Sequence, residues 1–186
     1  MEVYTYVSTA ISPLLTVDLR FVEHSQEVLD LYQRASDYVL LETGLAPDQA
    51  TVEDFFFDFP PGGALEQSFK LGLFTHAGHL AGIADLGFGF PKKHDAYIGL
   101  LLIEPAHRGM GAGRLMINEL EARARLRGAD RLLVAVLDEN TKGRDFWERE
   151  GFEHILSSPP METGHKTHIR HRLARKISKL EKAIHK

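Results

Sequence analysis

The stretch HRGMGAGRLM, residues 107–116, constrains the fold of this chain more than any other. Gly109, Gly111 and Gly113 stand at every second position, between an apolar run that ends in Pro105 and a segment with helical spacing. Glycine costs about 1 kcal/mol relative to alanine inside a helix, so three glycines at a helix start need a local reason. A strand that enters a helix through such a turn leaves backbone N–H groups free for an anion, and glycine lets the anion approach. The turn therefore predicts a phosphate site, although tight strand–helix packing would also explain the glycines.

The spacing of these glycines differs from that of two common phosphate-binding loops. The pattern GxxxxGK[ST] is excluded because no Lys-Ser/Thr pair follows the turn. The pattern GxGxxG does not fit because the third glycine comes one residue too early, and Asp130 meets only loosely the acid expected about 20 residues downstream. The glycine turn alone is therefore weak evidence for any one ligand.

Length and composition set broader limits. A chain of 186 residues, 44% hydrophobic and 26% charged, is typical of one globular domain with a sizeable core. No apolar run approaches the ~20 residues of a membrane span, and no Lys or Arg precedes Arg20, so we expect no membrane partner and no signal or transit peptide. The absence of cysteine excludes disulfides, thiolate metal sites and cysteine nucleophiles, and it fits a cytoplasmic location.

The net charge of −4 conceals two regions of opposite sign. Residues 165–186 contain eight Lys or Arg and one acid, whereas residues 35–69 contain seven acids and no Lys or Arg. The seven acids are Asp37, Glu42, Asp48, Glu53, Asp54, Asp58 and Glu66. A solvated acidic face and a basic tail would explain these runs. Alternatively, the acidic region attracts a cationic small molecule.

Hydrophobic periodicity predicts an α/β domain. Strands are expected at 17–23, 68–75, 80–90, 97–103, 131–137 and 166–173, with a further strand that starts at 151–152. Helices are expected at 25–43, 48–57, from the glycines to about 127, and at 140–150. The run 97–103 is apolar on both faces, so it should be a central buried strand. We divide the chain into an N-terminal extension (1–16), one domain (17–173) and a C-terminal amphipathic basic helix (174–186) with a stripe of Leu173, Ile177, Leu180 and Ile184.

Two motifs together carry a family resemblance. Residues 108–113 have the form [QR]-x-x-G-x-[GA] and follow a buried strand, and Asn140-x-x-Gly143-x-x-Phe146-Trp147 lies downstream. With the order of elements, this combination resembles the GCN5-related N-acetyltransferase (GNAT) family over about residues 17–173. The resemblance implies a GNAT fold, in which a single mixed, mostly antiparallel sheet has a splayed parallel pair at its centre and is flanked by helices. Here the splayed pair would be the strands at 97–103 and 131–137.

The resemblance further implies that the chain transfers an acetyl group from acetyl-CoA to an acceptor, usually a primary amine. The pantetheine arm of CoA would enter the splayed pair like a missing strand and bond to backbone groups of Leu101, Leu102 and Ile103. The pyrophosphate would lie on N–H groups of the glycine turn. The residues that the turn would contribute are Arg108, Gly109, Met110, Gly111, Ala112, Gly113 and Arg114. Asn140 would contact the arm and Phe146 would pack beside it. No metal is implied.

The catalytic groups depart from the family pattern. A base is needed because an ammonium ion cannot attack. Many family members carry an acid or histidine nine residues before the motif arginine, where this chain has Gly99. Tyr97 lies two residues earlier, on the same strand face, and is our catalytic candidate, with Asp85, Asp95 and His94 as looser options. Tyr97 could act directly or through water, and the family also permits deprotonation through a water relay without a dedicated base.

The family's usual tyrosine, seven residues after the motif asparagine, is Trp147 in this chain. In the family that tyrosine's hydroxyl can protonate the leaving thiolate, whereas an indole N–H is far too weak an acid. Trp147 is therefore expected to pack on the sheet, and the thiolate would leave unaided or be protonated by water, the acceptor or another residue.

Three alternatives concern ligands and partners. His165, His168 and His171 lie three apart on a predicted strand, which puts His168 on the opposite face and disfavours a shared metal. The missing tyrosine and base would permit a non-catalytic acetyl-CoA sensor. The basic tail would permit docking on nucleic acid, although it lacks interleaved aromatic residues. Packing of the tail on its own domain or in a homodimer is the stronger interpretation. The acceptor is expected to be a small molecule or peptide amine, and a cationic one.

Overall fold

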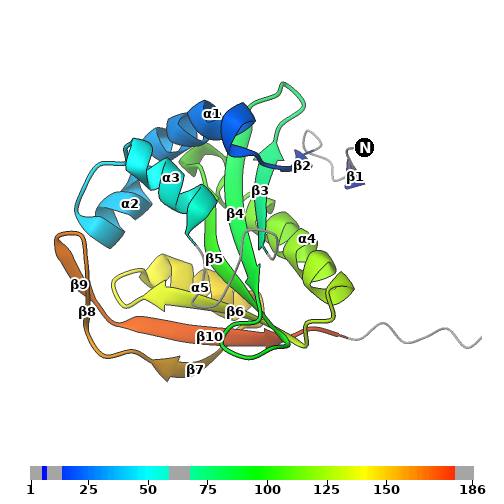
Figure 1. The fold of residues 1–186 in the computed structure, drawn as a ribbon, viewed down its shortest axis with the longest axis vertical. Coiled ribbons are helices and arrows are strands. Elements are labelled where there is room, and N and C mark those ends of the chain that lie inside the picture. Colours follow the sequence, from blue (N-terminus) through cyan, green and yellow to red (C-terminus); the bar gives the residue numbers. More distant parts are fainter. Residues whose placement is uncertain (1–5, 8–13, 59–67, 179–186) are drawn as a thin grey trace, which may run out of the picture.

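The computed structural model describes residues 6–7, 14–58 and 68–178, which form an eight-stranded sheet of order β1-β2-β3-β4-β5-β6-β10-β7 (Figure 1). Its strands are β1 (Tyr6–Val7), β2 (Leu14–Asp18), β3 (Ser68–Phe74), β4 (Leu80–Phe88), β5 (Asp95–Ile103), β6 (Arg131–Leu137), β7 (Glu153–Ser157) and β10 (Arg170–Lys176). A separate hairpin joins β8 (Met161–Thr163) to β9 (Lys166–His168). Strands β5 and β6 pair in parallel, and the other sheet neighbours are antiparallel. The predicted mixed sheet with an internal parallel pair is confirmed.

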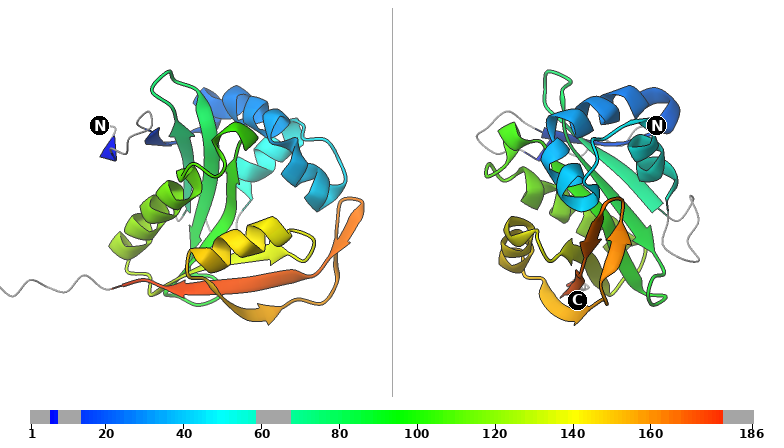
Figure 2. Two further views of the ribbon diagram at one scale, coloured as in Figure 1. Left: turned by 180° about the vertical axis from the view of Figure 1, so that it is seen from behind. Right: turned by 90° about the vertical axis from the view of Figure 1, so that its left-hand side faces the viewer.

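Helices cover both faces of the sheet (Figure 2). On one face lie α1 (Phe21–Arg34), α2 (Ser36–Thr43) and α3 (Gln49–Phe57), which share a buried cluster with alternate residues of the strands. The other face carries α4 (Ala112–Leu126) and α5 (Thr141–Arg149), with a larger buried cluster beneath them. A 3₁₀ turn, η2 (Pro105–His107), precedes the glycines. The single predicted helix over 25–43 is two helices, α1 and α2, which are separated at the buried Ala35.

The first strand was predicted too far along the chain. Strand β2 ends at Asp18, and α1 begins at Phe21, inside the expected strand 17–23. Phe21 packs from the start of the helix against Phe56 and Phe57 of α3, with ring centroids 5.5 and 5.0 Å away. Alternation of apolar residues cannot reveal this tertiary contact, which explains the error.

The prediction of a C-terminal helix at 174–186 is wrong for residues 174–178, the part that the structure describes. Residues 174–176 belong to β10, which pairs with β6 and β7, and residues 177–178 follow without regular structure. Leu173 and Ile177 are buried together in the core on the α4 side. A spacing of four residues places two side chains on one face of a strand as well as of a helix, so the stripe did not distinguish them. Leu180 and Ile184 lie outside the described residues.

Strands β5 and β6 pair only along their first halves. The parallel pairing runs from Asp95 opposite Arg131 to Ile98 opposite Val134. Beyond that point β5 stays paired with β4 and β6 stays paired with β10, so a gap opens between them. The register of β5 against β4 shifts at the same level and leaves Gly99 as an extra residue. Such a bulge bends a strand and ends pairing, which accounts for the gap.

The closed end of the parallel pair is held by an ion pair. Arg131 donates two hydrogen bonds to Asp95, at 2.8 and 2.7 Å, and the Asp95 side chain is only 4% exposed. These are the first residues of the two strands and lie directly opposite one another. The pair therefore fixes the point from which both strands run toward the gap.

Replacing Arg131 with methionine should lower the free energy of unfolding by about 2 kcal/mol, because it leaves the buried carboxylate of Asp95 without its partner. Arg131 is itself partly exposed, so the loss should fall below that of a fully buried pair. Urea denaturation measures the change. Arg20→Met, which removes the exposed Arg20–Glu23 pair, is the control and should cost less than about 1 kcal/mol. Equal losses in the two variants would contradict this role for the ion pair.

Candidate functional site

The β5 side of the gap offers backbone groups to a ligand. The N–H of Glu104, just after β5, donates to Ala81 O of the neighbouring β4 at 3.0 Å. Because backbone groups alternate along a strand, Leu102 turns its groups toward β4, and Leu101 and Ile103 turn theirs toward the gap. The backbone of Leu101 and Ile103 is therefore placed to bond a ligand in the gap, and that of Leu102 is not.

The glycine turn forms the open N-terminus of α4. Gly109 and Gly111 have φ values of +76° and +87°, a left-handed conformation that glycine adopts readily. At both positions a Cβ would meet no heavy atom within 4 Å, so the turn is open on that side. Gly111 is the N-cap and has no side chain to satisfy the first N–H groups of the helix, at Ala112, Gly113 and Arg114. This arrangement suits an anion.

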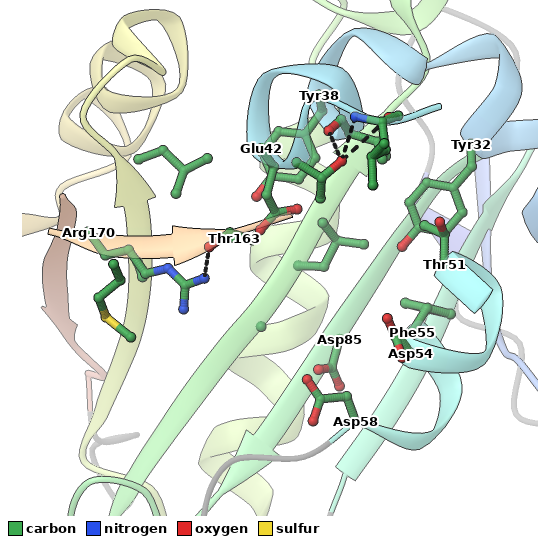
Figure 3. Close-up of a pocket in the computed structure, with 18 of the residues that line it drawn as sticks. Tyr32, Tyr38, Glu42, Thr51, Asp54, Phe55, Asp58, Asp85, Thr163 and Arg170 are labelled. Carbon is green, nitrogen blue, oxygen red and sulfur yellow. Dashed lines mark hydrogen bonds between the residues drawn. The ribbon is translucent and has the colours of Figure 1, made fainter. Parts of the chain in front are cut away.

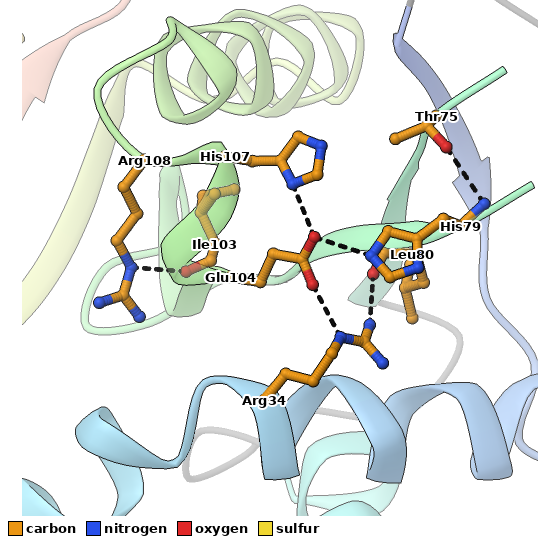
Figure 4. A network of polar contacts seen from close by, with 8 residues as sticks. All are labelled: Arg34, Thr75, His79, Leu80, Ile103, Glu104, His107 and Arg108. Atoms are coloured by element: carbon orange, nitrogen blue, oxygen red, sulfur yellow. Dashed lines mark hydrogen bonds and ion pairs between the residues drawn. The ribbon is translucent and has the colours of Figure 1, made fainter. Parts of the chain in front are cut away.

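A buried carboxylate anchors the start of the turn (Figure 4). Glu104 accepts a hydrogen bond from Arg34 of α1 at 2.7 Å and contacts His79 and His107 at 2.7 and 2.6 Å. Burial alone would raise the pKa of Glu104, but the hydrogen bonds from Arg34 and His79 outweigh it and lower that pKa. Arg34 also donates to Leu80 O at 2.8 Å, so the network ties the turn to α1 and to the start of β4.

Arg108 of the turn has partners within the protein. Its guanidinium donates to Ile103 O at 2.7 Å and to both carboxylate oxygens of Asp37 on α2, at 2.5 and 2.9 Å. The hydrogen bonds from Arg108 lower the pKa of Asp37. The side chain of Arg108 therefore holds the turn against α2, and it occupies the carbonyl of Ile103 at the edge of the gap.

The downstream motif braces the far side of the turn. Asn140 Oδ1 caps α5 by accepting the N–H of Gly143 at 2.9 Å, and a Cβ at Gly143 would lie only 2.5 Å from Asn140 Nδ2. Phe146 packs against Gly113, where a Cβ would lie 2.8 Å from the ring. The motif thus joins α5 to the first turn of α4.

Trp147 is part of the core. Its side chain is 6% exposed and lies between Phe146 and Phe152, with ring centroids 5.2 and 4.9 Å away. It does not line the cavity described below. These contacts agree with the packing role expected for Trp147.

A large cavity lies on the α1–α3 face of the sheet, where the gap begins (Figure 3). Its volume is about 1000 Å³. One wall comes from α2 and α3, and the opposite wall from β10 and the segments around β8. The floor contains Gly99 and Leu100 of β5 and Ala135 and Leu137 of β6, which face each other across the gap. The hairpin of β8 and β9 is joined to α2 by a hydrogen bond from the N–H of His165 to Thr43 O, at 2.7 Å.

Acidic side chains predominate in this cavity. The titratable and charged residues in its lining are Glu42, Asp48, Asp54, Asp58, Asp85, Tyr32, Tyr38, Tyr97, Arg170 and Arg172. Four of the seven acids of residues 35–69 are among them, whereas Asp37 pairs with Arg108 and Glu66 lies outside the described residues. Burial raises the pKa of Glu42, and the nearby cation of Arg170 only partly opposes this rise. Burial also raises the pKa of Tyr32 and Tyr38.

The structure separates the four residues considered as bases. Tyr97 lines the cavity, with its ring 5.6 Å from that of Phe90. Asp85 also lines it, and a Cβ at Gly99 would overlap Asp85 Oδ2. Asp95 is held by Arg131 at the closed end of the parallel pair, and neither Asp95 nor His94 lines the cavity. Sequence reasoning ranked Asp85 low because its place over Gly99 depends on strand register.

The histidines near the C-terminus have separate partners. His168 is buried and contacts Glu42 O at 2.9 Å, and His171 contacts Ser157 Oγ at 2.8 Å. His165 contributes the backbone contact to α2 described above. Within residues 6–7, 14–58 and 68–178, no group of three or more His, Asp or Glu side chains is arranged to hold a metal ion. In the same part of the chain, no helix is long and apolar enough to span a membrane.

Comparisons with known proteins agree with this geometry. The family model "Acetyltransferase (GNAT) family" matches residues 26–152. An acetyltransferase from Thermus thermophilus superposes with a TM-score of 0.70 at 22% identity, over 92% of this chain and 99% of that one. The ribosomal-protein-S18-alanine N-acetyltransferase from Escherichia coli gives 0.67 at 16% identity, over 93% and 99%. Ard1 from Thermoplasma volcanium gives 0.67 at 16% identity, over 89% and 99%. At these identities the likeness shows the fold alone, and the search of curated proteins found no match.

The contact between Gly113 and Phe146 can be tested with a double-mutant cycle. In an ordinary helix Gly→Ala stabilises by about 1 kcal/mol, but the Phe146 ring should cancel or reverse that gain at Gly113. In a Phe146→Ala background the ring is absent, so Gly113→Ala should then stabilise. Thermal unfolding of the wild type, the two single variants and the double variant gives the coupling free energy between the two positions. Additive effects of the two substitutions would show that the ring does not constrain Gly113.

Proposed function

The chain belongs to the acetyltransferase (GNAT) family, and from this premise we propose that it transfers an acetyl group from acetyl-CoA to a primary amine. The observation that carries the proposal is that three features adjoin one another: the gap between β5 and β6, the acidic cavity and the glycine turn. The gap between β5 and β6 runs from the cavity at Gly99 toward the glycine turn before α4. A donor held at the turn and an acceptor held in the cavity would meet at Gly99.

The residues around the gap fit the donor. The nested N–H groups of the turn suit a pyrophosphate, and a strand edge suits the amides of the pantetheine arm. We assign the turn residues Gly109, Met110, Gly111, Ala112, Gly113 and Arg114 to the pyrophosphate. Leu101 and Ile103 would bond the arm, whereas Leu102, Arg108, Asn140 and Phe146 would support it from positions already engaged with the protein. Acetyl-CoA itself supplies the activated acetyl group.

The cavity favours a cationic acceptor. Five carboxylates face two guanidinium groups in its lining, so the acidic side chains are in excess. Opposite charge raises the local concentration of a ligand at a cleft. We therefore propose a small-molecule or peptide amine with an additional positive charge.

An acceptor screen tests the activity. The protein is incubated with acetyl-CoA and amines, polyamines, amino acids, aminoglycosides or peptides, and free CoA is measured. Release of CoA with one acceptor class supports the proposal. Tight binding of acetyl-CoA without turnover on any amine would instead indicate a sensor.

Gly111→Glu should weaken acetyl-CoA binding by about 10- to 100-fold, because a carboxylate would lie where the helix N-terminus attracts the pyrophosphate. Isothermal titration calorimetry measures the affinity. Gly128→Glu is the control: Gly128 also has positive φ, at +75°, and lies in an open position after the C-terminus of α4. The Gly128→Glu substitution therefore imposes similar backbone strain, but far from the glycine turn before α4. Equal affinity in the two variants would show that the turn is only structural.

Asp54→Asn should raise KM for a cationic acceptor by about two- to tenfold and leave kcat nearly unchanged, because it removes one attracting charge. Steady-state kinetics at two salt concentrations measures the effect, which should shrink as salt rises. Glu53→Gln is the matched control, since Glu53 is exposed on the same helix but does not line the cavity. If Glu53→Gln changes KM as much as Asp54→Asn, the attraction is not local to the cavity.

A further inference from the structure

We infer that Asp85 accepts the proton that the acceptor amine loses before it attacks, from a position over Gly99 at the head of the gap. The inference rests on the proposed acetyl transfer and assigns a catalytic role within it. Tyr97 was the sequence candidate for this role, and the geometry favours Asp85 instead.

The position of Asp85 follows from the strand bulge. Asp85 on β4 lies opposite Leu100, and the next residue of β4, Leu86, lies opposite Ile98, so Gly99 is skipped. The three heavy atoms nearest to a Cβ placed on Gly99 all belong to the Asp85 side chain. The carboxylate of Asp85 therefore covers the first residue of β5 beyond its last pair with β6.

This place is where donor and acceptor would meet. Gly99 is separated from Ile103, at the turn end of β5, by four residue steps, or about 13 Å at ~3.3 Å per residue. A donor anchored at the turn and extended along the gap would point its reactive end toward Gly99. Asp85 and Gly99 both line the cavity proposed for the acceptor. A carboxylate at this junction can reach an amine that attacks there.

Lys70 is the ion-pair partner of the Asp85 carboxylate. Lys70 lies directly opposite Asp85 on β3, with its Nζ 2.9 Å from Asp85 Oδ1, and only 5% of its side chain is exposed. It also donates to Asp58 O at 3.4 Å and stands 5.4 Å from the centre of the Phe55 ring. Burial raises the pKa of Asp85, and Lys70 opposes that rise. The pKa of Asp85 stays above its usual value, which makes its carboxylate a stronger base than an exposed one.

Other titratable groups surround Asp85 from each packed element. Asp54 of α3 and Asp58, just after that helix, lie near Asp85 in Figure 3. Tyr32 of α1 and Tyr97 of β5 line the same cavity. The charge of Asp58 adds to the rise in the pKa of Asp85. Tyr97 also faces the cation of Arg172, whose guanidinium carbon lies 5.6 Å from the ring centre. Of these groups, Asp85 has the side chain nearest to a Cβ placed on the skipped Gly99.

The proton balance of the step is complete. Asp85 takes one proton from the acceptor ammonium, and the freed lone pair on nitrogen forms the new C–N bond. The C–S bond breaks and its electron pair leaves on sulfur. The second nitrogen proton passes to sulfur, so the products are the acetamide and the thiol of CoA. Asp85 then releases its proton to solvent.

The first test moves the carboxylate from one strand to the next. Asp85→Asn should lower kcat for the acceptor by about 100-fold or more, as is typical for loss of a general base, without weakening acetyl-CoA binding. Asp85→Ala should be equally impaired. The double variant Asp85→Ala/Gly99→Asp should have a kcat at least about tenfold higher than that of Asp85→Ala. Removal of the Asp85 carboxylate clears the space over Gly99 for the new one. Gly99→Asp alone should not be active, because the two carboxylates would overlap.

The second test follows protonation with and without turnover. The reaction needs ionised Asp85, so kcat/KM should fall as pH drops through its pKa, which lies above the usual aspartate value. Lys70→Met removes the opposing cation and should move this acidic limb to higher pH. Carbon-13 NMR of labelled aspartate provides a readout without substrate. The resonance that is missing in Asp85→Asn should titrate above those of exposed aspartates, and higher still in Lys70→Met.

The outcomes separate this inference from the proposed function. Wild-type protein that acetylates no amine overturns the proposed function, and the inference with it. An active wild type with an unimpaired Asp85→Asn variant overturns the inference alone. A raised acceptor KM at unchanged kcat would make Asp85 an ammonium anchor and also overturn it. If Asp85→Asn fails to fold, the strand exchange and the Lys70→Met pH profile decide the matter.

Discussion

The early end of pairing between β5 and β6 is the constraint on which the rest of the structure depends. Each strand keeps its outer neighbour over its full length, β4 for β5 and β10 for β6. The extra residue Gly99 bends β5 just where the parallel ladder stops, so the sheet opens at its middle and not at an edge. Helices flank this opening on both faces of the sheet, and each face contributes a different part of the candidate site. The α4 side supplies the open helix N-terminus proposed for the pyrophosphate, and the α1–α3 side supplies an acidic cavity.

The residues of the two sequence motifs hold this opening in shape. Phe146 closes on Gly113, Asn140 caps α5, and Arg108 reaches across to Asp37 on α2. These contacts link α5 to α4 and the glycine turn to α2, around a place where direct strand pairing is missing. The motifs therefore support the scaffold, in addition to the ligand contacts proposed for them. A family motif can thus identify the fold even where the side chain it names is hydrogen-bonded within the protein.

The sequence predicted the features that depend on local spacing. The glycine turn, the buried strands on either side of α4 and the position of the parallel pair all follow from periodicity and glycine placement. The strand predicted at 166–173 is present as β9 and β10, but β10 continues to Lys176, where a helix was predicted. That end was wrong because the spacing of Leu173 and Ile177 fits a strand as well as a helix. The place of Asp85 over Gly99 was out of reach because it depends on a one-residue shift between β4 and β5. Such a shift leaves no trace in the pattern of either strand alone.

The acidic stretch shows why charge counted along a sequence overstates the field at a site. The carboxylate of Asp37 is paired with Arg108, and Asp48 accepts the N–H of Thr51 as the N-cap of α3. Glu42 is partly buried beside Tyr38 and Arg170, and the cation of Arg170 offsets its charge. The negative charge that could attract the proposed cation therefore lies mainly on one wall, at Asp54 and Asp58, next to Asp85 with its own counter-ion Lys70. An ammonium drawn to that wall arrives beside the group proposed to take its proton, so binding and deprotonation would depend on the same few carboxylates.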